Sequence, residues 1–372
     1  MRNPRKLMSS RGRRDDARAR TIESCLQAFE SVRMRPTRRS VVRTLALAAC
    51  TAAAFAAQAA PVTLLNVSYD VTREFYRDYD AAFVAHWKQA GGEAIVVNQS
   101  HGGSSKQARS VIDGLEADVI TMNQATDIDI LAERGALVPA NWATRLPDNS
   151  APTTSVQVIL VHKGNPKGLH EWADLARPGV SVVIPNPKTS GNGRYAYLAS
   201  WGSVVKAGGT AAQAREQVAR TFANVPVFDG GGRAATTTFA QRNIGDALVT
   251  FESEVELIKA EFGDNFEVVY PKRTVLAENP VAVVDKVVDR KHTRKEAEAY
   301  LQWLYSDDGQ EIAAKHGLRP RNAKILAAHA REFPKVDTFT VDEVFGSWKQ
   351  AQKTHFDDGG TYDQILAATH RQ

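Results

Sequence analysis

The stretch "NPKTSGNGR", residues 186–194, joins a run of apolar residues to an amphipathic segment through small, flexible residues. The run before it, 180–184, predicts a strand, and the apolar spacing after it predicts a helix over 194–206. At such a junction the first N–H groups of the helix lack intrahelical partners and carry a partial positive charge, so they can bind anions. The stretch therefore predicts an anion site in an α/β protein.

Two further turns share this composition and this position. "SHGGSSKQA", residues 100–108, lies between an expected strand and an expected helix, and so does "DGGGRAATTT", residues 229–238. One such turn is commonly no more than a turn and a helix cap. Three of them at the carboxyl ends of strands, where open α/β sheets bind their ligands, favour a site that holds a doubly charged anion without a contacting lysine.

The order of the expected elements predicts two lobes. Short apolar strands alternate with helical patterns, which is typical of βα units and a largely parallel sheet. The pattern restarts after residue 152, and the apolar strands 156–162 and 281–284 enclose the second set of units, which predicts two crossings between the lobes. The expected divisions are a leader at 1–59, a first lobe at 60–152, a second lobe at 153–279, and the rest of the first lobe with C-terminal helices at 280–372.

The charge is uneven along the chain. The formal net charge is +5, but 13 of the 47 basic residues and four of the 42 acidic residues lie in the first 43 positions, which leaves 34 basic and 38 acidic residues. The remainder is mildly acidic, so we expect no nucleic-acid partner. With 372 residues, 43% hydrophobic and 24% charged, the chain is typical of a globular protein of two domains.

Residues 41–59 resemble a secretory signal, because a short apolar region follows basic residues and ends in the small-x-small site Ala57-Gln58-Ala59. We expect export to the periplasm and cleavage near Ala59. Both cysteines, Cys25 and Cys50, lie in this leader, so the remainder is expected to have neither a disulfide nor a cysteine metal site.

The leader leaves the export route open. Arg38-Arg39 is compatible with twin-arginine export, and Leu47-Ala48-Ala49-Cys50 is compatible with lipidation. Met34 heads a signal of more usual length, so the translation start is open as well.

Motifs of the common enzyme classes are absent from the sequence. It contains no nucleotide P-loop, no dinucleotide fingerprint after the first strand, no G-x-S-x-G and no H-E-x-x-H. His101 is the one candidate for a general base, and Ser190 has no neighbouring residue in the sequence to activate it. Glu252, Glu254 and Glu256 alternate as on an exposed strand or helix face. We expect no catalytic residue, cofactor or metal.

Several long stretches carry a family likeness. They are "LLNVSYDVTREFY" (64–76), "QSHGGSSKQA" (99–108), "RLPDNSAPTTS" (145–155), "VHKGNPK" (161–167), "NPKTSGNGRYAYLASWG" (186–202), "DGGGRAATTTFAQRNIGDALVTFESE" (229–254) and "FGSWKQAQKTHFDDGGTYDQI" (345–365). Together they resemble the periplasmic sulfate- and thiosulfate-binding proteins of ABC uptake systems. "TMNQATDIDIL" (121–131) and "FESEV" (251–255) lean toward the thiosulfate-binding branch.

The resemblance implies a fold, a function and a set of contacts. The fold is a two-lobed, type II periplasmic binding protein that closes over one anion, with a hinge at two crossing strands. The function is capture of sulfate or thiosulfate by a monomer and delivery to the membrane permease of an ABC transporter. The implied contacts are Asp70, Ser104, Ser190, Gly191, Asn192 and Gly232, together with Phe251.

Phe251 stands where sulfate-specific members of the family have a tryptophan. Phenylalanine lacks the indole donor, and a sulfate oxygen left without it would lose about 1–3 kcal/mol. Thiosulfate has a larger, weakly accepting sulfur, so Phe251 favours thiosulfate, with dual specificity left open. We also expect the Asp70 carboxylate to point away from the anion. An enzyme or an anion sensor on the same fold, acting on another oxyanion, is the alternative function.

Overall fold

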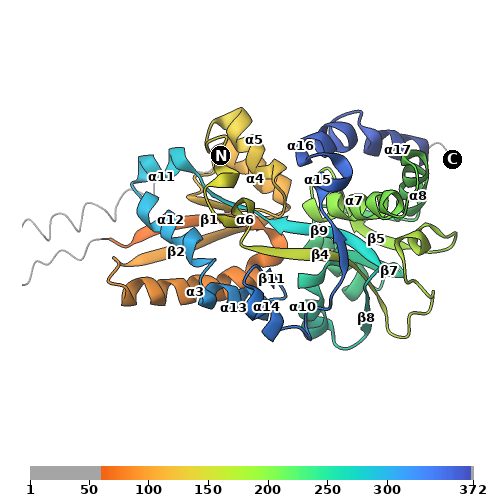
Figure 1. Ribbon diagram of the computed structural model, residues 1–372, viewed down its shortest axis with the longest axis horizontal. Coiled ribbons are helices and arrows are strands. Elements are labelled where there is room, and N and C mark those ends of the chain that lie inside the picture. Colours follow the sequence, from red (N-terminus) through yellow and green to blue (C-terminus); the bar gives the residue numbers. More distant parts are fainter. Residues whose placement is uncertain (1–59, 370–372) are drawn as a thin grey trace, which may run out of the picture. The chain divides into compact units, whose positions relative to one another are not determined.

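Two mixed sheets form the framework of the chain, which a computed structural model describes over residues 60–369 (Figure 1). The first sheet has the order β10-β3-β1-β2. Its strands β1 (Val62–Tyr69), β2 (Ile95–Gly102) and β3 (Val119–Thr121) are parallel, whereas β10 (Val281–Val283) runs antiparallel to β3. The expected cleavage site near Ala59 and both cysteines lie outside the described residues.

The second sheet has the order β12-β9-β4-β7-β5-β6. Strand β5 (Val182–Pro185) is parallel to β6 (Phe228–Asp229) and to β7 (Ala247–Phe251). The long strand β4 (Thr153–His162) pairs antiparallel with β7 and with β8 (Phe266–Val269). The first sheet is therefore largely parallel, as expected, apart from its edge strand β10, whereas the second sheet is mixed. We call the part built on the first sheet lobe I and the part built on the second sheet lobe II.

The helices cover the sheets (Figure 1). Those of lobe I include α3 (Arg73–Gln89), α4 (Ser104–Ile112), α5 (Thr126–Gly135), α11 (Asp285–Lys291), α12 (Arg294–Trp303), α13 (Asp307–Lys315) and α14 (Ala323–Ala328). Those of lobe II include α7 (Gly191–Lys206), α8 (Ala211–Ala223), α9 (Gly232–Thr236), α10 (Glu252–Phe262), α15 (Val341–Phe345), α16 (Trp348–Ala351) and α17 (Thr361–Thr369). Among the helices of residues 60–369, none has both the length and the apolar character that a bilayer crossing requires.

Helix α7 runs through the core of lobe II. Every residue from Gly191 to Gly202 is buried, and Tyr195 and Tyr197 are fully enclosed. An alanine at Gly202 would place its Cβ 2.2 Å from the ring of Phe339, so the helix packs against its neighbours at the closest separation that glycine allows. Because this helix is fixed, the turn that precedes it is fixed as well.

The strand that returns the chain between the sheets differs from the expectation. Val281–Val283 was expected to cross, but it is an edge strand of the first sheet. The return crossing is β9 (Arg273–Asn279), which pairs with the first half of β4. Its sequence, Arg-Thr-Val-Leu-Ala-Glu-Asn, begins and ends with polar residues, so it lacks the apolar run by which buried strands are recognised. Strands β4 and β9 are therefore the crossings into and out of the second set of units.

The C-terminal helices belong to lobe II. After β12 (Asp337–Phe339), which pairs with β9, the helices α15 to α17 pack on α7 and α8. Phe356, Tyr362 and Ile365 are buried in the same apolar cluster as the residues of α7. The chain thus passes between the lobes a third time, in the segment before β12.

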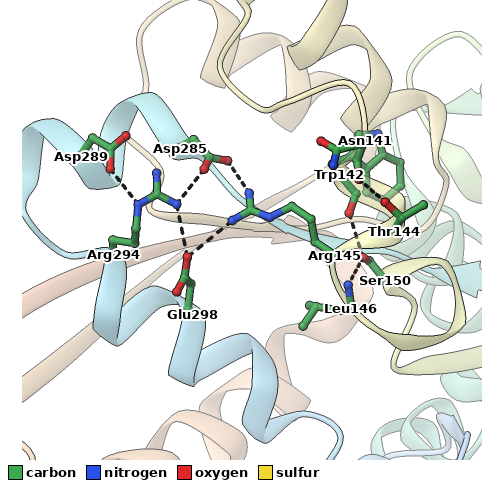
Figure 2. A network of polar contacts seen from close by, with 10 residues as sticks. All are labelled: Asn141, Trp142, Thr144, Arg145, Leu146, Ser150, Asp285, Asp289, Arg294 and Glu298. Atoms are coloured by element: carbon green, nitrogen blue, oxygen red, sulfur yellow. Dashed lines mark hydrogen bonds and ion pairs between the residues drawn. The ribbon is translucent and has the colours of Figure 1, made fainter.

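A polar network fixes the segment of lobe I that leads into β4 (Figure 2). Arg145 lies 2.7 Å from a carboxylate oxygen of Asp285 and 3.5 Å from one of Glu298. Arg294 reaches the same two carboxylates, at 2.7 and 3.3 Å. Ser150 closes the segment by donating its hydroxyl to an earlier backbone carbonyl group at 3.0 Å. The first crossing strand therefore starts from an anchored point.

Candidate functional site

Three helices begin at the small-residue turns identified in the sequence. The carbonyl groups of Gly103, Ser190 and Gly231 accept the first helical hydrogen bonds of α4, α7 and α9, at 2.9, 3.1 and 3.1 Å. The preceding N–H groups in each first turn have no acceptor within their own helix. Each turn therefore presents free backbone donors at the carboxyl end of a strand, as the sequence predicts.

The three turns meet at one place between the lobes. A Cβ atom on Gly103 of lobe I would lie 2.6 Å from the carbonyl oxygen of Thr189 and 3.2 Å from that of Gly230, both in lobe II. The Thr189 hydroxyl also donates to the Gly230 carbonyl at 3.1 Å, which joins the second turn to the third. Ser104 and Ser190, which follow Gly103 and Thr189, are buried beside this contact.

Asp70, Asn192 and Gly232 lie at the same junction. A Cβ on Gly232 would lie 3.2 Å from Nδ2 of Asn192 and 3.8 Å from a carboxylate oxygen of Asp70. The backbone N–H of Arg233 donates to Asp70 at 3.3 Å. The Asp70 carboxylate thus caps the start of α9, and whether it points away from a bound anion stays a prediction.

Phe251 ends β7 behind these turns and is buried. Its ring packs edge-on against Tyr69 of lobe I and Tyr195 of α7, with centroids 6.4 and 5.7 Å apart. The preceding residue, Thr250, accepts a hydrogen bond from Nδ2 of Asn192 at 3.3 Å. All of the residues that the family resemblance implied as contacts are therefore brought together.

Three cations near the second and third turns are engaged elsewhere. Lys188, within the second turn, lies 2.9 Å from the Asp363 carboxylate on α17. The Arg194 side chain donates to the Pro187 carbonyl at 2.9 Å, and the Arg233 guanidinium pairs with Glu74 of lobe I at 2.6 Å. The turns also present neutral amide and hydroxyl donors at the junction, and the absence of a lysine in contact with the anion stays a prediction.

The acidic run after Phe251 corrects an expectation. Residues 252–262 form α10, and Glu252 and Glu254 are buried in it, whereas only Glu256 is exposed. Neither carboxylate oxygen of Glu254 has a hydrogen-bond partner in the described chain. Burial raises the pKa of Glu254 to about 8, and the nearby charge of Asp70 adds to this effect. Glu254 is therefore mostly uncharged at neutral pH.

His101, the one candidate base, is tied into the first sheet. Its Nδ1 lies 3.0 Å from the Tyr69 carbonyl oxygen, and its Nε2 lies 2.7 Å from Oε1 of Gln99. Burial lowers the pKa of His101. Neither ring nitrogen is left to act on a ligand. Within residues 60–369, histidine, aspartate and glutamate side chains do not gather in the threes that a metal site requires.

Other polar residues at the junction were not singled out from the sequence. Gln157 on β4 donates to Oδ1 of Asn192 at 2.9 Å, and its own Oε1 is buried without a partner in the described residues. Asn123 lies against Gly191, and its Oδ1 is likewise buried without a hydrogen-bond partner in the described residues. The signal for Gln157 is a polar residue inside an apolar strand, and the signal for Asn123 is its position directly after a strand.

A cavity of about 550 Å³ opens between the lobes next to the turns. Ser105 and Asp127 line it from lobe I, and Lys188 and Phe356 line it from lobe II. Acidic and basic side chains are mixed in its lining, so the cavity does not form a second anion site of its own.

Comparisons with known proteins agree with this geometry. A family model described as bacterial extracellular solute-binding protein matches residues 47–319. A thiosulfate-binding protein of Pseudomonas aeruginosa is 64% identical over 82% of this chain and 92% of that protein, and a sulfate-binding protein of Salmonella typhimurium is 55% identical over 82% and 93%. The sulfate-binding protein SubI from Mycobacterium tuberculosis has a similar structure, with a TM-score of 0.73 and 29% identity over 80% of this chain and all of that one. The expected two-lobed, type II fold is confirmed.

Proposed function

This chain belongs to the sulfate- and thiosulfate-binding proteins, within the bacterial extracellular solute-binding proteins, and from that membership we propose that it captures sulfate or thiosulfate between its lobes for uptake. It is a binding protein and not an enzyme, because its close relatives are named as sulfate- or thiosulfate-binding proteins. The observation that carries the proposal is the meeting of three helix starts at Gly103, Thr189 and Gly230. Helix starts favour anions because their N–H groups and dipoles face the ligand.

The proposed contacts are the backbone N–H groups and hydroxyls at the junction. Asp70 and Ser104 contribute from lobe I, and Ser190, Gly191, Asn192 and Gly232 contribute from lobe II, where the ring of Phe251 completes the site. Because each lobe supplies only part of the coordination, the anion stabilises the closed arrangement. Binding and closure are then one equilibrium.

Neutral donors also account for selectivity. Phosphate keeps a proton at neutral pH, and a buried proton without an acceptor costs a few kcal/mol. Sulfate and thiosulfate carry none. Phe251 offers no donor to a fourth oxygen and favours the sulfur of thiosulfate, and the 64% identity to a thiosulfate-binding protein supports the same preference.

We place the protein in the periplasm, after removal of the leader near Ala59, where as a monomer it delivers its anion to a membrane permease of an ABC transporter. The transporter's ATPase is a separate chain, since this sequence has no nucleotide P-loop.

Calorimetric titration tests the proposal. We expect sulfate or thiosulfate to bind at pH 7 and phosphate to bind far more weakly. Ser190→Ala should weaken binding about tenfold or more, because it removes a hydrogen bond to a charged group. Ser203→Ala is the matched control, since Ser203 lies on the same helix and donates to the Ser200 carbonyl. Phosphate binding as tightly as sulfate would contradict the proposed selectivity.

A further inference from the structure

A fourth segment lies at the carboxyl edge of the first sheet. Strand β3 ends at Thr121, and its register with β1 brings Thr121 beside Ser68, one residue before Tyr69, the last of β1. Residues 122–125, which lead from β3 to α5, therefore leave the sheet at the edge where the first turn lies. The Ser104 hydroxyl lies 3.5 Å from Sδ of Met122, which links this segment to the first turn.

The side chain of Asn123 in this segment reaches across to lobe II. A Cβ on Gly191 would lie 2.0 Å from Oδ1 of Asn123 and 2.9 Å from its Nδ2. The carboxamide thus occupies the space that a side chain at Gly191 would need, at the first residue of α7. The three atoms nearest to that Cβ position all belong to the Asn123 carboxamide.

Asn123 is only 3% exposed, and its Oδ1 has no hydrogen-bond partner within residues 60–369. A buried polar atom without a partner is costly, so such groups are ordinarily paired with protein, water or ligand. The Oε1 of the neighbouring Gln124 also has no partner in the described residues, but its Nε2 donates to Asp127 at 2.7 Å and to Ser105 at 3.2 Å, which holds that side chain in place. The segment is fixed, while Oδ1 of Asn123 has no partner among residues 60–369.

A carboxamide can present either its oxygen or its nitrogen to the same point by a half-turn about its terminal bond. Because sulfate and thiosulfate only accept hydrogen bonds, the favoured orientation of the carboxamide is the one that turns Nδ2 toward the anion. Resting on the proposed function, we infer that Asn123 is a further anion-binding residue, which donates an N–H from lobe I to the sulfur oxyanion at the start of α7.

This role gives the residue a part in both affinity and closure. Asp70 and Ser104 are the other proposed contacts from lobe I, and Asn123 adds a side-chain donor to that lobe. The site then has as many hydrogen-bond donors as it would have with an indole N–H at position 251 in lobe II. Because Asn123 meets Gly191 only where the lobes touch, its bond to the anion forms only when the lobes close.

Titration of two variants tests the inference. Asn123→Ala should bind sulfate, thiosulfate or both about tenfold to a hundredfold more weakly than the wild type, as expected for loss of a hydrogen bond to a charged group. Asn98→Ala is the matched control, because Asn98 is an exposed asparagine on β2 of the same lobe. It should bind within twofold of the wild type.

Nuclear magnetic resonance of wild-type protein labelled with nitrogen-15 at asparagine gives a second reading that does not depend on the variant folding. The side-chain N–H pair of Asn123, assigned through its own backbone, should shift on addition of the anion, and that of Asn98 should not. Wild-type affinity in Asn123→Ala, or an unmoved Asn123 resonance in protein saturated with anion, overturns the inference. Failure of the wild type to bind either anion overturns the proposed function itself.

Discussion

Replacement of Gly103 by alanine separates closure from folding. The backbone of Gly103 has φ −56° and ψ 131°, which any residue adopts, so the change introduces no backbone strain. The added Cβ would meet the Thr189 carbonyl oxygen at 2.6 Å, whereas ordinary contacts begin at 3.4 Å. The lobes must therefore move apart by about 0.8 Å at this point.

The cost falls on the closed arrangement alone, because Thr189 and Gly230 belong to the other lobe. Overpacking of this kind costs about 1–3 kcal/mol, which corresponds to a loss of affinity of about 5- to 150-fold when binding requires closure. The thermal midpoint of the ligand-free protein should stay within about 2 °C of the wild type, since either lobe alone accommodates the methyl group.

Calorimetry with thiosulfate and thermal unfolding without it are the assays. Gly230→Ala is the control, because a Cβ there meets nothing within 4 Å although the residue lies in the same contact. It should bind within about twofold of the wild type. Wild-type affinity in Gly103→Ala would refute the reasoning, and so would a loss of ligand-free stability as large as the loss of affinity.

Three further perturbations follow from the site. Glu254→Gln removes a carboxyl whose pKa burial raises from 4.5 to about 8. Because the folded pKa exceeds the unfolded one, the wild type loses stability as pH rises from about 4.5 to 8, by about 5 kcal/mol at pH 8.5. Urea unfolding over this pH range should show the variant free of this loss. Phe251→Trp introduces an indole donor and should raise the ratio of sulfate to thiosulfate affinity about tenfold in parallel titrations. The variant should also lose some stability, because the larger ring must fit an enclosed site. An unchanged affinity ratio would show that the donor does not reach the anion. Glu74→Gln breaks the half-buried pair with Arg233 at 2.6 Å and should weaken anion binding less than tenfold. This difference in affinity should shrink as the salt concentration rises from about 50 to about 500 mM. Equal affinities of the variant and the wild type at low salt would exclude a part of this pair in closure.

The sequence predicts the local parts of the site well. Small residues between a strand and a helix define a turn by their own backbone preferences, so the starts of α4, α7 and α9 could be located to within about three residues. The resemblance to known motifs then named the residues at those turns. These signals lie within short segments and do not depend on the rest of the chain.

What the sequence could not give depends on distant segments. Asn123 and Gly191 meet because two lobes pack, and no periodicity relates positions so far apart. Strand β9 was missed because its ends are polar, although its pairing with β4 buries most of it. Glu254 was expected on an exposed face, since acidic residues are seldom buried, and only the packing of α10 encloses it.

The third passage of the chain has a consequence for how the protein folds. The same apolar cluster encloses residues of α7 together with Phe356, Tyr362 and Ile365, which lie about 150 positions later in the sequence. Lobe II is thus completed by segments that are synthesised well after α7. A nascent chain that stops short of these helices leaves a large apolar surface uncovered, so this lobe cannot complete its core until they have been synthesised.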